Sequence, residues 1–353
     1  MKPVAIEVVA PGSYASLQDL GRRGLRRVGV PWAGALDPRL MRIANALVGN
    51  REHTAVIECF DGGLQLAARG GVVRVAVAGD VTVEIERAGQ RQQLAAWRSL
   101  CLADGDVLRL RRLERGRIAV IAIEGLLVSQ VLGSVSTYPR ALLGGLDGRA
   151  LTAGVCIPTA PATERREQML PDPAPDGFAP IRVVAGPQAD HFSSVTLGAF
   201  VAADYLVTSD ADRMGLRLEG PPLDRLGSRE IVSDATVPGS IQVPGNGQPI
   251  VLLADAQTAG GYPKIATVIG ADLPRLAASR PGQVLRFVVI DAAEAEHLAR
   301  AAESRTRALI TSLRPLTVGG IDEVAIYACN LVSGVVDALS DEPAALTGNQ
   351  LDG

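Results

Sequence analysis

One stretch decides the fold: Val237 to Asp272, which reads VPGSIQVPGNGQPIVLLADAQTAGGYPKIATVIGAD. It begins with a short alternating segment, Ser240 to Val243, of the kind that forms a strand. The Asn246-Gly247 pair that follows is the strongest short hairpin signal, because both residues accept a positive φ. The apolar run Pro249 to Ala254 is long enough for a buried strand, and a second run, Ile265 to Ile269, closes the unit. The stretch therefore predicts a β-rich unit around a hairpin.

The buried strand ends in a dense group of polar and flexible residues: Asp255, Gln257, Thr258, Gly260, Gly261, Tyr262 and Lys264. Asp255 can orient a ligand or accept a proton, and Gln257 and Thr258 can hydrogen-bond an amide or a carboxylate. The paired glycines let backbone approach a ligand closely and present bare N–H groups. Lys264 is one of two lysines in the chain, which favours a site that uses a compact charge. The alternative is a turn whose polar groups satisfy one another.

Length and composition exclude several classes of protein. A chain of 353 residues exceeds one ordinary domain, so two are expected. The net charge of −3 argues against nucleic-acid binding. No apolar run of about 18 residues occurs and Met1-Lys2-Pro3 does not lead into a signal peptide, so we expect a cytoplasmic protein with no membrane partner. Walker A, G-x-G-x-x-G and G-x-S-x-G motifs are absent, which argues against P-loop, dinucleotide and α/β-hydrolase enzymes.

The cysteines and histidines do not suggest a metal site. Neither C-x-x-C nor HExxH spacing occurs among Cys59, Cys101, Cys156, Cys329, His53, His191 and His297. The cysteines are expected to be small buried residues. A carboxylate-held Mg²⁺ that arrives with a nucleotide remains compatible with the sequence.

The first half predicts a barrel or sandwich rather than a Rossmann unit. Its strands are short and valine-rich, at residues 4–10, 55–59, 63–66, 72–78, 81–86, 107–111 and 118–123. A helix is expected at Arg39 to Leu47, with Asp37 as N-cap and Pro38 at its first position. On it, Asn45 is most simply a buried hydrogen-bonding residue. Glu58 ends an apolar strand and is either outward-facing or functional.

Two arginine-containing segments leave their roles open. Arg22, Arg23, Arg26 and Arg27 can hold an anion or face solvent, and solvent is favoured for Arg23 and Arg26. The glycine-rich loop at residues 133–151 either offers Arg140 and Arg149 to an anion or is a structural loop that Arg149 pins to a carbonyl.

A proline-rich break divides the chain and predicts its domains. An N-terminal domain covers residues 1–157, a linker 158–180, a C-terminal domain 181–290, and a helical extension with a tail 291–353. The C-terminal part predicts strands at residues 181–185, 205–208 and 282–288, and helices at residues 292–313 and 324–339.

Motifs in both halves resemble one family. They are Gln18-Asp19, Gly21-Arg22, Gly29-Val30-Pro31, Gly34-Ala35-Leu36-Asp37, residues 44–50 (ANALVGN), Glu58, residues 133–137 (GSVST), residues 144–149 (GGLDGR), residues 213–220 (RMGLRLEG) and residues 238–276. In this order they are similar to the second subunit of the allophanate-hydrolase-like, or carboxyltransferase A/B, family over about residues 5–290. Ala33 and Ala259 depart from the family's usual residues, and neither change removes a charge.

The resemblance implies a mainly β protein with some α structure, made of two cyclophilin-like β-barrel domains in tandem. The family includes the C-subunit of the bacterial ATP-dependent 5-oxoprolinase, to which the motifs are most similar. That likeness implies ATP-dependent opening of 5-oxoproline to L-glutamate, with ATP and Mg²⁺ used in the complex. It also implies two partners. One is an allophanate-hydrolase-like subunit 1, which is the B-subunit of 5-oxoprolinase and a kinase-inhibitor homologue, and the other is the lactam hydrolase, which is the A-subunit.

Two alternatives come from the same family. One is biotin-dependent carboxyl transfer to urea or a related amide, as in urea carboxylase. The other is a non-catalytic regulator that binds a kinase-inhibitor homologue.

The matched positions suggest roles in a lactam site. Catalytic candidates are Asp255, Lys264 and Gln257. A substrate carboxylate needs a cation, for which Arg213, Arg217 or Lys264 is the candidate, and the lactam amide needs Gln242, Gln257 or Asp255. Further substrate contacts are expected from Thr258, Gly260, Gly261 and Tyr262. Other family positions are Gln18, Asp19, Arg22, Asp37, Asn45, Glu58 and Arg149.

Overall fold

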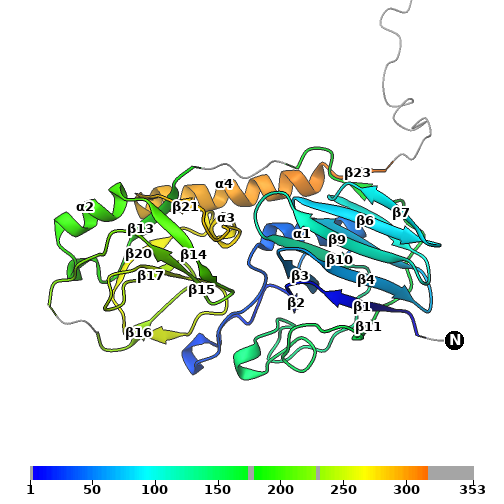
Figure 1. Cartoon of the computed structure of the whole chain (residues 1–353), viewed down its shortest axis with the longest axis horizontal. Coiled ribbons are helices and arrows are strands. Elements are labelled where there is room, and N and C mark those ends of the chain that lie inside the picture. The colour runs from blue at the N-terminus through cyan, green and yellow to red at the C-terminus, as the bar shows by residue number, and fades with distance from the viewer. Residues whose placement is uncertain (1–2, 174–178, 228–230, 317–353) are drawn as a thin grey trace, which may run out of the picture. The chain divides into compact units, whose positions relative to one another are not determined.

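The computed structural model describes residues 3–173, 179–227 and 231–316. Met1–Pro315 form one compact unit. The protein is mainly β with few helices, and it contains several antiparallel sheets and one nearly closed barrel (Figure 1). Within the described ranges, no helix has the length and apolar character needed to span a bilayer. The helix expected at residues 324–339 lies outside the described residues.

Two sheets form from the first part of the chain. One contains β1 Ala5–Pro11, β4 Leu64–Arg69, β6 Val81–Arg87, β7 Gln90–Leu94, β9 Val107–Leu113 and β11 Cys156–Pro158, in the order β11-β1-β4-β9-β6-β7. The other contains β2 Tyr14–Gln18, β3 Val56–Phe60, β5 Val73–Ala78, β8 Arg98–Leu102, β10 Ile118–Ile123, β12 Gln168–Met169 and β23 Arg314–Pro315, in the order β2-β3-β10-β5-β8-β12-β23. The expected strands of this half are confirmed within a few residues.

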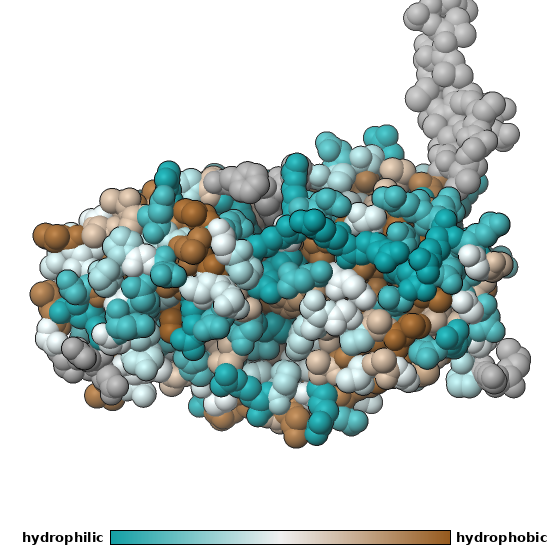
Figure 2. Space-filling view, in the orientation of Figure 1, coloured by the Kyte–Doolittle hydropathy of each residue, from teal (hydrophilic) through white to brown (hydrophobic). Residues whose placement is uncertain are grey.

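The two sheets enclose a core of aliphatic side chains such as Leu66, Val75 and Ile121. Every residue of β10, IAVIAI, is buried because its other face packs in a second core that includes α1 (Pro38–Val48). Strands β6 and β9 also carry charged side chains: Arg109 of β9 pairs with Glu86 of β6 at 2.8 Å. Figure 2 shows hydrophilic side chains over β6, β7 and β9.

The barrel forms from the second half. Its strands are β13 Ile181–Ala185, β14 Tyr205–Ala211, β15 Gly215–Glu219, β17 Ser240–Gln242, β18 Ile250–Leu252, β20 Lys264–Val268, β21 Val284–Leu285 and β22 Phe287–Val289, in the order β21-β14-β15-β18-β17-β20-β13-β22. The single strand expected at residues 282–288 is wrong. It breaks at Arg286 into β21 and β22, which pair with opposite edges of the sheet, so the chain itself nearly closes the barrel.

The helices cover and connect these sheets. They are α1, α2 Ser194–Ala202, α3 Leu273–Ala277 and α4 Ala292–Thr311, with short 3₁₀ turns η1 Arg26–Val28, η2 Pro139–Ala141 and η3 Ala189–His191. Asp37 caps α1 by accepting hydrogen bonds from the N–H groups of Arg39 and Leu40, which confirms the expected start of that helix. The helix expected at residues 292–313 is confirmed as α4, which packs on α1 through Arg42 and Glu303, 2.6 Å apart (Figure 1).

Several elements were not expected from the sequence. β2 was missed because its segment has mixed polarity, with polar Ser16 and Gln18 buried along with Ala15 and Leu17. α2, β7 and β8 were missed as well. Within the segment expected as a linker, Met169 of β12 pairs with Arg98 of β8. The short pair β16 (Asp234–Ala235) and β19 (Ala259–Gly260) is formed by loops beside the barrel.

Candidate active site

A buried ion cluster joins the two halves of the chain. Arg213, in the turn between β14 and β15, donates from Nε and Nη2 to both carboxylate oxygens of Asp255 at 3.0 Å. Its Nη1 donates to Glu58 Oε1 and its Nη2 to the carbonyl of Gly34. The N–H of Leu36 donates to the second oxygen of Glu58 at 2.7 Å. The cluster therefore fixes β3, the 34–36 loop and the end of β18 together.

The cluster places one cation between two carboxylates. Burial raises the pKa of Glu58 and of Asp255, although the neighbouring guanidinium opposes both shifts. Burial would lower the pKa of Arg213, but the two carboxylates outweigh it and raise that pKa. The cluster thus keeps its arginine charged and holds a carboxyl proton more readily than exposed acids do.

A cavity of about 320 Å³ lies over this cluster, and Asp255 and Arg213 are part of its wall. Tyr14, Tyr138 and Arg140 also line it. Burial raises the pKa of both tyrosines, and the charge of Asp255 raises that of Tyr138 further. The phenols therefore remain protonated at neutral pH and can donate hydrogen bonds beside a carboxylate.

The central stretch builds a second polar cluster at the mouth of the barrel. Gln257 Nε2 donates to Gln242 Oε1 at 3.3 Å. Gln242 is buried, and its own Nε2 has no hydrogen-bonding partner among the residues that the structure describes. A Cβ added at Gly260 would lie 2.5 Å from that nitrogen, so a larger residue there would displace the Gln242 amide. The amide N–H of Gln242 is therefore an unused donor, which a ligand carbonyl would satisfy.

Lys264 is neutralised within the protein. Its Nζ lies 2.9 Å from Asp234 Oδ2, which also accepts from Gln188 Nε2 at 3.0 Å. These hydrogen bonds lower the pKa of Asp234 to about 2. Lys264 itself is 1% exposed. The structure therefore places Lys264 in an internal ion pair.

The remaining predicted residues of the central region are distributed over the surface. The side chain of Arg217 is 61% exposed and pairs loosely with Asp210 at 3.8 Å, so it does not share a site with Arg213. Tyr262 is exposed, and Thr258 and Gly261 are half-buried. Thr258 contributes its carbonyl, which accepts from the N–H of Thr236 at 3.1 Å.

The first-half motif residues form a third cluster. The carboxylate of Asp19 accepts from Ser134 Oγ, Ser136 Oγ and the N–H groups of Val135 and Gly21 at 2.5–2.8 Å. Gln18 is buried beside it and bonds to Ser16 and Thr137. Arg22 is buried, and its Nε donates to the carbonyl of Val131 at 3.1 Å. Arg149 has an exposed side chain, and its backbone N–H bonds to Leu146.

The structure decides several roles that the sequence left open. Glu58 is fully buried, so its outward-facing alternative is wrong. The solvent-facing expectation for Arg26 is also wrong, because its guanidinium bonds to the carbonyls of Thr236 and Gln257. Arg23 is exposed as expected, and it stacks over Trp32 at 4.3 Å. Asn45 is confirmed as a buried hydrogen-bonding residue, since its Nδ2 donates to Thr54 at 2.7 Å.

Four site residues were missed: Tyr14, Tyr138, Gln188 and Asp234. Tyr138 follows directly on the GSVST motif, and Asp234 lies just before the central stretch, so each lies next to a segment that resembles the family. Tyr14 lies in the unexpected β2, and Gln188 lies in a loop after β13. No local pattern marked those two.

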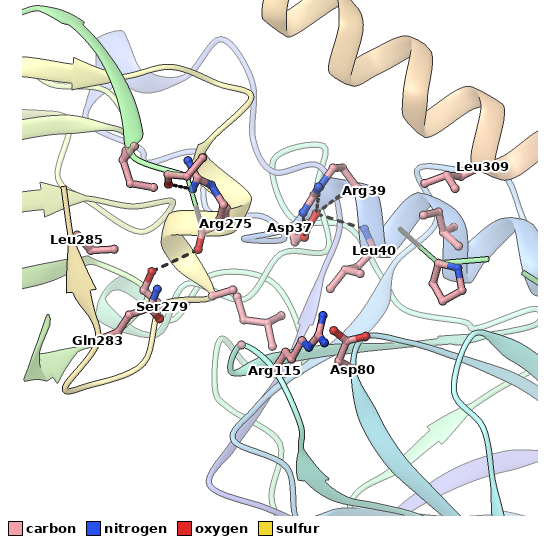
Figure 3. Close-up of a pocket in the computed structure, with 18 of the residues that line it drawn as sticks. Asp37, Arg39, Leu40, Asp80, Arg115, Arg275, Ser279, Gln283, Leu285 and Leu309 are labelled. Atoms are coloured by element: carbon pink, nitrogen blue, oxygen red, sulfur yellow. Dashed lines mark hydrogen bonds and ion pairs between the residues drawn. The ribbon is translucent and has the colours of Figure 1, made fainter. Parts of the chain in front are cut away.

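A second, larger cavity of about 430 Å³ lies between the halves (Figure 3). Asp37 at the N-cap of α1, Leu40 of α1, Leu285 of the barrel and Leu309 of α4 lie around it, together with Arg115. Among the described residues, none of the central stretch, Val237 to Asp272, lines this cavity. In the part of the chain that the structure describes, no group of three or more His, Cys, Asp or Glu side chains is arranged to hold a metal ion.

Comparisons with known proteins identify the family. The chain is 36% identical over 302 residues to the 5-oxoprolinase C-subunit of Haemophilus influenzae, and the match covers 84% of this chain and 94% of that protein. It is 36% identical over 307 residues to the 5-oxoprolinase C-subunit of Escherichia coli, where the match covers 82% and 93%. The chain is therefore homologous to the C-subunit of 5-oxoprolinase.

A solved structure and a family model agree with this relationship. The urea carboxylase of Kluyveromyces lactis superimposes with a TM-score of 0.79 and 28% identity over 90% of this chain, which spans 30% of the length of that enzyme. Residues 28–289 match the model described as carboxyltransferase domain, subdomain A and B. The chain therefore belongs to the carboxyltransferase A/B family.

Proposed function

We propose that this chain is the C-subunit of an ATP-dependent 5-oxoprolinase that opens 5-oxoproline to L-glutamate. The observation that carries the proposal is the 36% identity to a protein of that name over 94% of its length. Its partners in the complex are an allophanate-hydrolase-like subunit 1 (the B-subunit) and a lactam hydrolase (the A-subunit). The complex works in the cytoplasm. MgATP, a substrate of the complex, supplies the phosphoryl group that activates the lactam carbonyl.

The proposal includes the finer architecture. Two cyclophilin-like barrels stand in tandem, at residues 1–157 and 181–290, with the segment 158–180 between them and an extension at 291–353. The ion cluster of Glu58, Arg213 and Asp255 then lies where the two barrels meet. This position supports a site that both domains build.

The chemistry of the clusters supports a lactam site. The lactam carbonyl needs a donor, and buried Gln242 has an unused amide N–H, with Gln257 holding its oxygen. Asp255 is the proton-handling group, since burial raises its pKa and the tyrosine-lined cavity opens at it. The Gly260-Gly261 backbone, Thr258 and Tyr262 form the rim. Lys264 acts on this site by holding Asp234 and Gln188 in place rather than by touching substrate.

The test is reconstitution of the complex. The chain is co-expressed with its two partners, and ADP and glutamate are assayed with 5-oxoproline while each component is omitted in turn. Asp255→Asn should lower turnover on the order of 10²- to 10⁴-fold without loss of assembly. Asp210→Asn, at an exposed acid of β14, is the control and should leave turnover unchanged.

Other outcomes point to other functions. Full assembly without consumption of 5-oxoproline would refute the proposal. Biotin-dependent carboxylation of urea is then the next assay, because the chain superimposes on a urea carboxylase along 90% of its length. Tight binding of subunit 1 with no turnover of either substrate would favour a non-catalytic regulator.

A further inference from the structure

Arg22 is a buried cation with unused donors. It is 1% exposed, and its Nε donates to the carbonyl of Val131 at 3.1 Å. Its Nη1 and Nη2 atoms have no hydrogen-bonding partner among the residues that the structure describes. A guanidinium removed from water without hydrogen bonds is unfavourable, so such a group is expected to meet an anion that the protein itself does not supply.

The acids near Arg22 are already engaged. Asp19 accepts four hydrogen bonds from the 134–136 segment and Gly21, and it forms no ion pair with Arg22. Both carboxylate oxygens of Asp255 accept hydrogen bonds from Nε and Nη2 of Arg213. Burial lowers the pKa of Arg22, and the charges of Asp19 and Asp255 oppose that shift, so both carboxylates lie near the guanidinium. A ligand bound there would lie beside the proposed proton-handling group.

The loop that covers Arg22 is shaped around it. Gly144 has a φ of +67°, and a Cβ added there would lie 2.2 Å from Arg22 Nη2. The neighbouring Gly145 is equally constrained, because its Cβ would lie 2.2 Å from Thr137 Oγ1. Gly144 therefore leaves room for the guanidinium, and Gly145 leaves room for the Thr137 side chain.

The cations expected to bind a substrate carboxylate are all less suitable. Arg213 is committed to two buried carboxylates, and Lys264 to Asp234. Arg217 is exposed and pairs loosely with Asp210. Arg22 instead offers two Nη groups in the fork geometry that matches a carboxylate.

We infer that Arg22 binds the carboxylate of the lactam substrate through its two Nη atoms, beneath the loop at residues 131–148. The inference rests on the proposed function and names the residue that distinguishes 5-oxoproline from a neutral lactam. Because Arg22 is only 1% exposed, a ligand reaches its Nη atoms when the residues that cover it move.

The experiment compares two lactams on the reconstituted complex. ADP release is measured with 5-oxoproline and with 2-pyrrolidinone, which is the same ring without the carboxylate. Arg22→Met should lower kcat/KM for 5-oxoproline on the order of 10- to 100-fold, chiefly through KM, and leave 2-pyrrolidinone turnover unchanged. Arg22→Lys should retain part of the discrimination, since a point charge replaces the fork. Arg27→Met, at an exposed arginine of the same segment, is the control and should change neither.

The outcomes separate this inference from the proposed function. Equal losses for both lactams in Arg22→Met would mean a structural role and overturn the inference, as would no loss for either. If the wild-type complex does not turn over 5-oxoproline, the proposed function fails, and calorimetric titration of the assembled complex with 5-oxoproline decides the inference alone. Binding that Arg22→Met abolishes and Arg27→Met preserves would support it, and binding that is absent or insensitive to Arg22 would overturn it.

Discussion

Arg213 is the residue on which the candidate site depends most, because its guanidinium satisfies two buried carboxylates from different halves of the chain. Its neighbour Arg217, four positions later, is exposed and weakly paired. The two arginines share a motif in the sequence, but they differ completely in environment. Burial therefore determines which of them contributes to stability and to the site.

Arg213→Met should destabilise the fold by about 3–5 kcal/mol, because it leaves two buried carboxylates without their cation. Arg217→Met should change the free energy of unfolding by no more than about 1 kcal/mol. Urea denaturation at neutral pH measures both. Equal effects of the two substitutions would show that the buried cluster does not hold the halves together. Adding Asp255→Asn to Arg213→Met should recover part of the loss.

The Asp234–Lys264 pair gives a pH dependence with a definite sign. Because the pKa of Asp234 is lowered to about 2 in the folded protein, its contribution to stability is present above the unfolded value of about 3.9 and is lost as the pH falls through 2. The difference in unfolding free energy between the wild type and Asp234→Asn should thus be visible at pH 5 and disappear toward pH 2. Asp234 is half-exposed, so the difference should be about 1 kcal/mol or less. If the difference between these two unfolding free energies grew as the pH fell, the Asp234–Lys264 ion pair would not be stabilising.

At the scale of elements, α1 depends on its N-cap residue, Asp37. Asp37 accepts hydrogen bonds from the N–H groups of Arg39 and Leu40, and Pro38 starts the helix with a suitable φ. α1 in turn packs against β5 and β10 on one side and α4 on the other. The cap therefore stabilises a helix to which much of the second core is attached.

Asp37→Ala should lower the free energy of unfolding by about 1 kcal/mol, within a range of about 0.5–2 kcal/mol, through loss of the cap. Asp37→Asn should cost much less, because asparagine caps about as well. Both are measured by urea denaturation. Equal losses for the two variants would attribute the effect to the charge, which pairs with Arg39 at 2.8 Å, rather than to the cap.

At the scale of the molecule, one hydrophobic core crosses between the halves. It contains Leu47 of α1 and Val120 of the first part together with Ile241 and Phe287 of the barrel. A second core, with Leu66, lies within the first part. Residues that share a core are expected to unfold together, so the halves should not behave as independent domains.

Leu47→Ala should destabilise the protein by about 2–5 kcal/mol, since the side chain is 1% exposed in the shared core. The free energy of opening measured by hydrogen exchange should then fall by the same amount in β5 of the first part and in β20 of the barrel. Wild-type protein should show one cooperative transition. Faster exchange confined to the first part would show that the halves unfold separately.

The elements that local physics encodes could be predicted from the sequence. The N-cap at Asp37, the long helix α4, most valine-rich strands and the hairpin around Asn246-Gly247 follow from capping, periodicity and turn chemistry. The ordered motifs also determined the family. Local rules failed at β2, where polar Ser16 and Gln18 are buried along with Ala15 and Leu17, and at Arg286, where the chain leaves one edge of the barrel for the other.

Only the tertiary structure decided which polar groups meet. Glu58 and Arg213 are 155 residues apart in the chain, yet they bond in the interior. Lys264 and Arg22 are both buried cations, but Lys264 has Asp234 beside it and Arg22 has no acid bonded to it among the described residues. Burial and pairing set the charge that a side chain can offer a ligand, and both depend on contacts between distant segments, which no local pattern encodes.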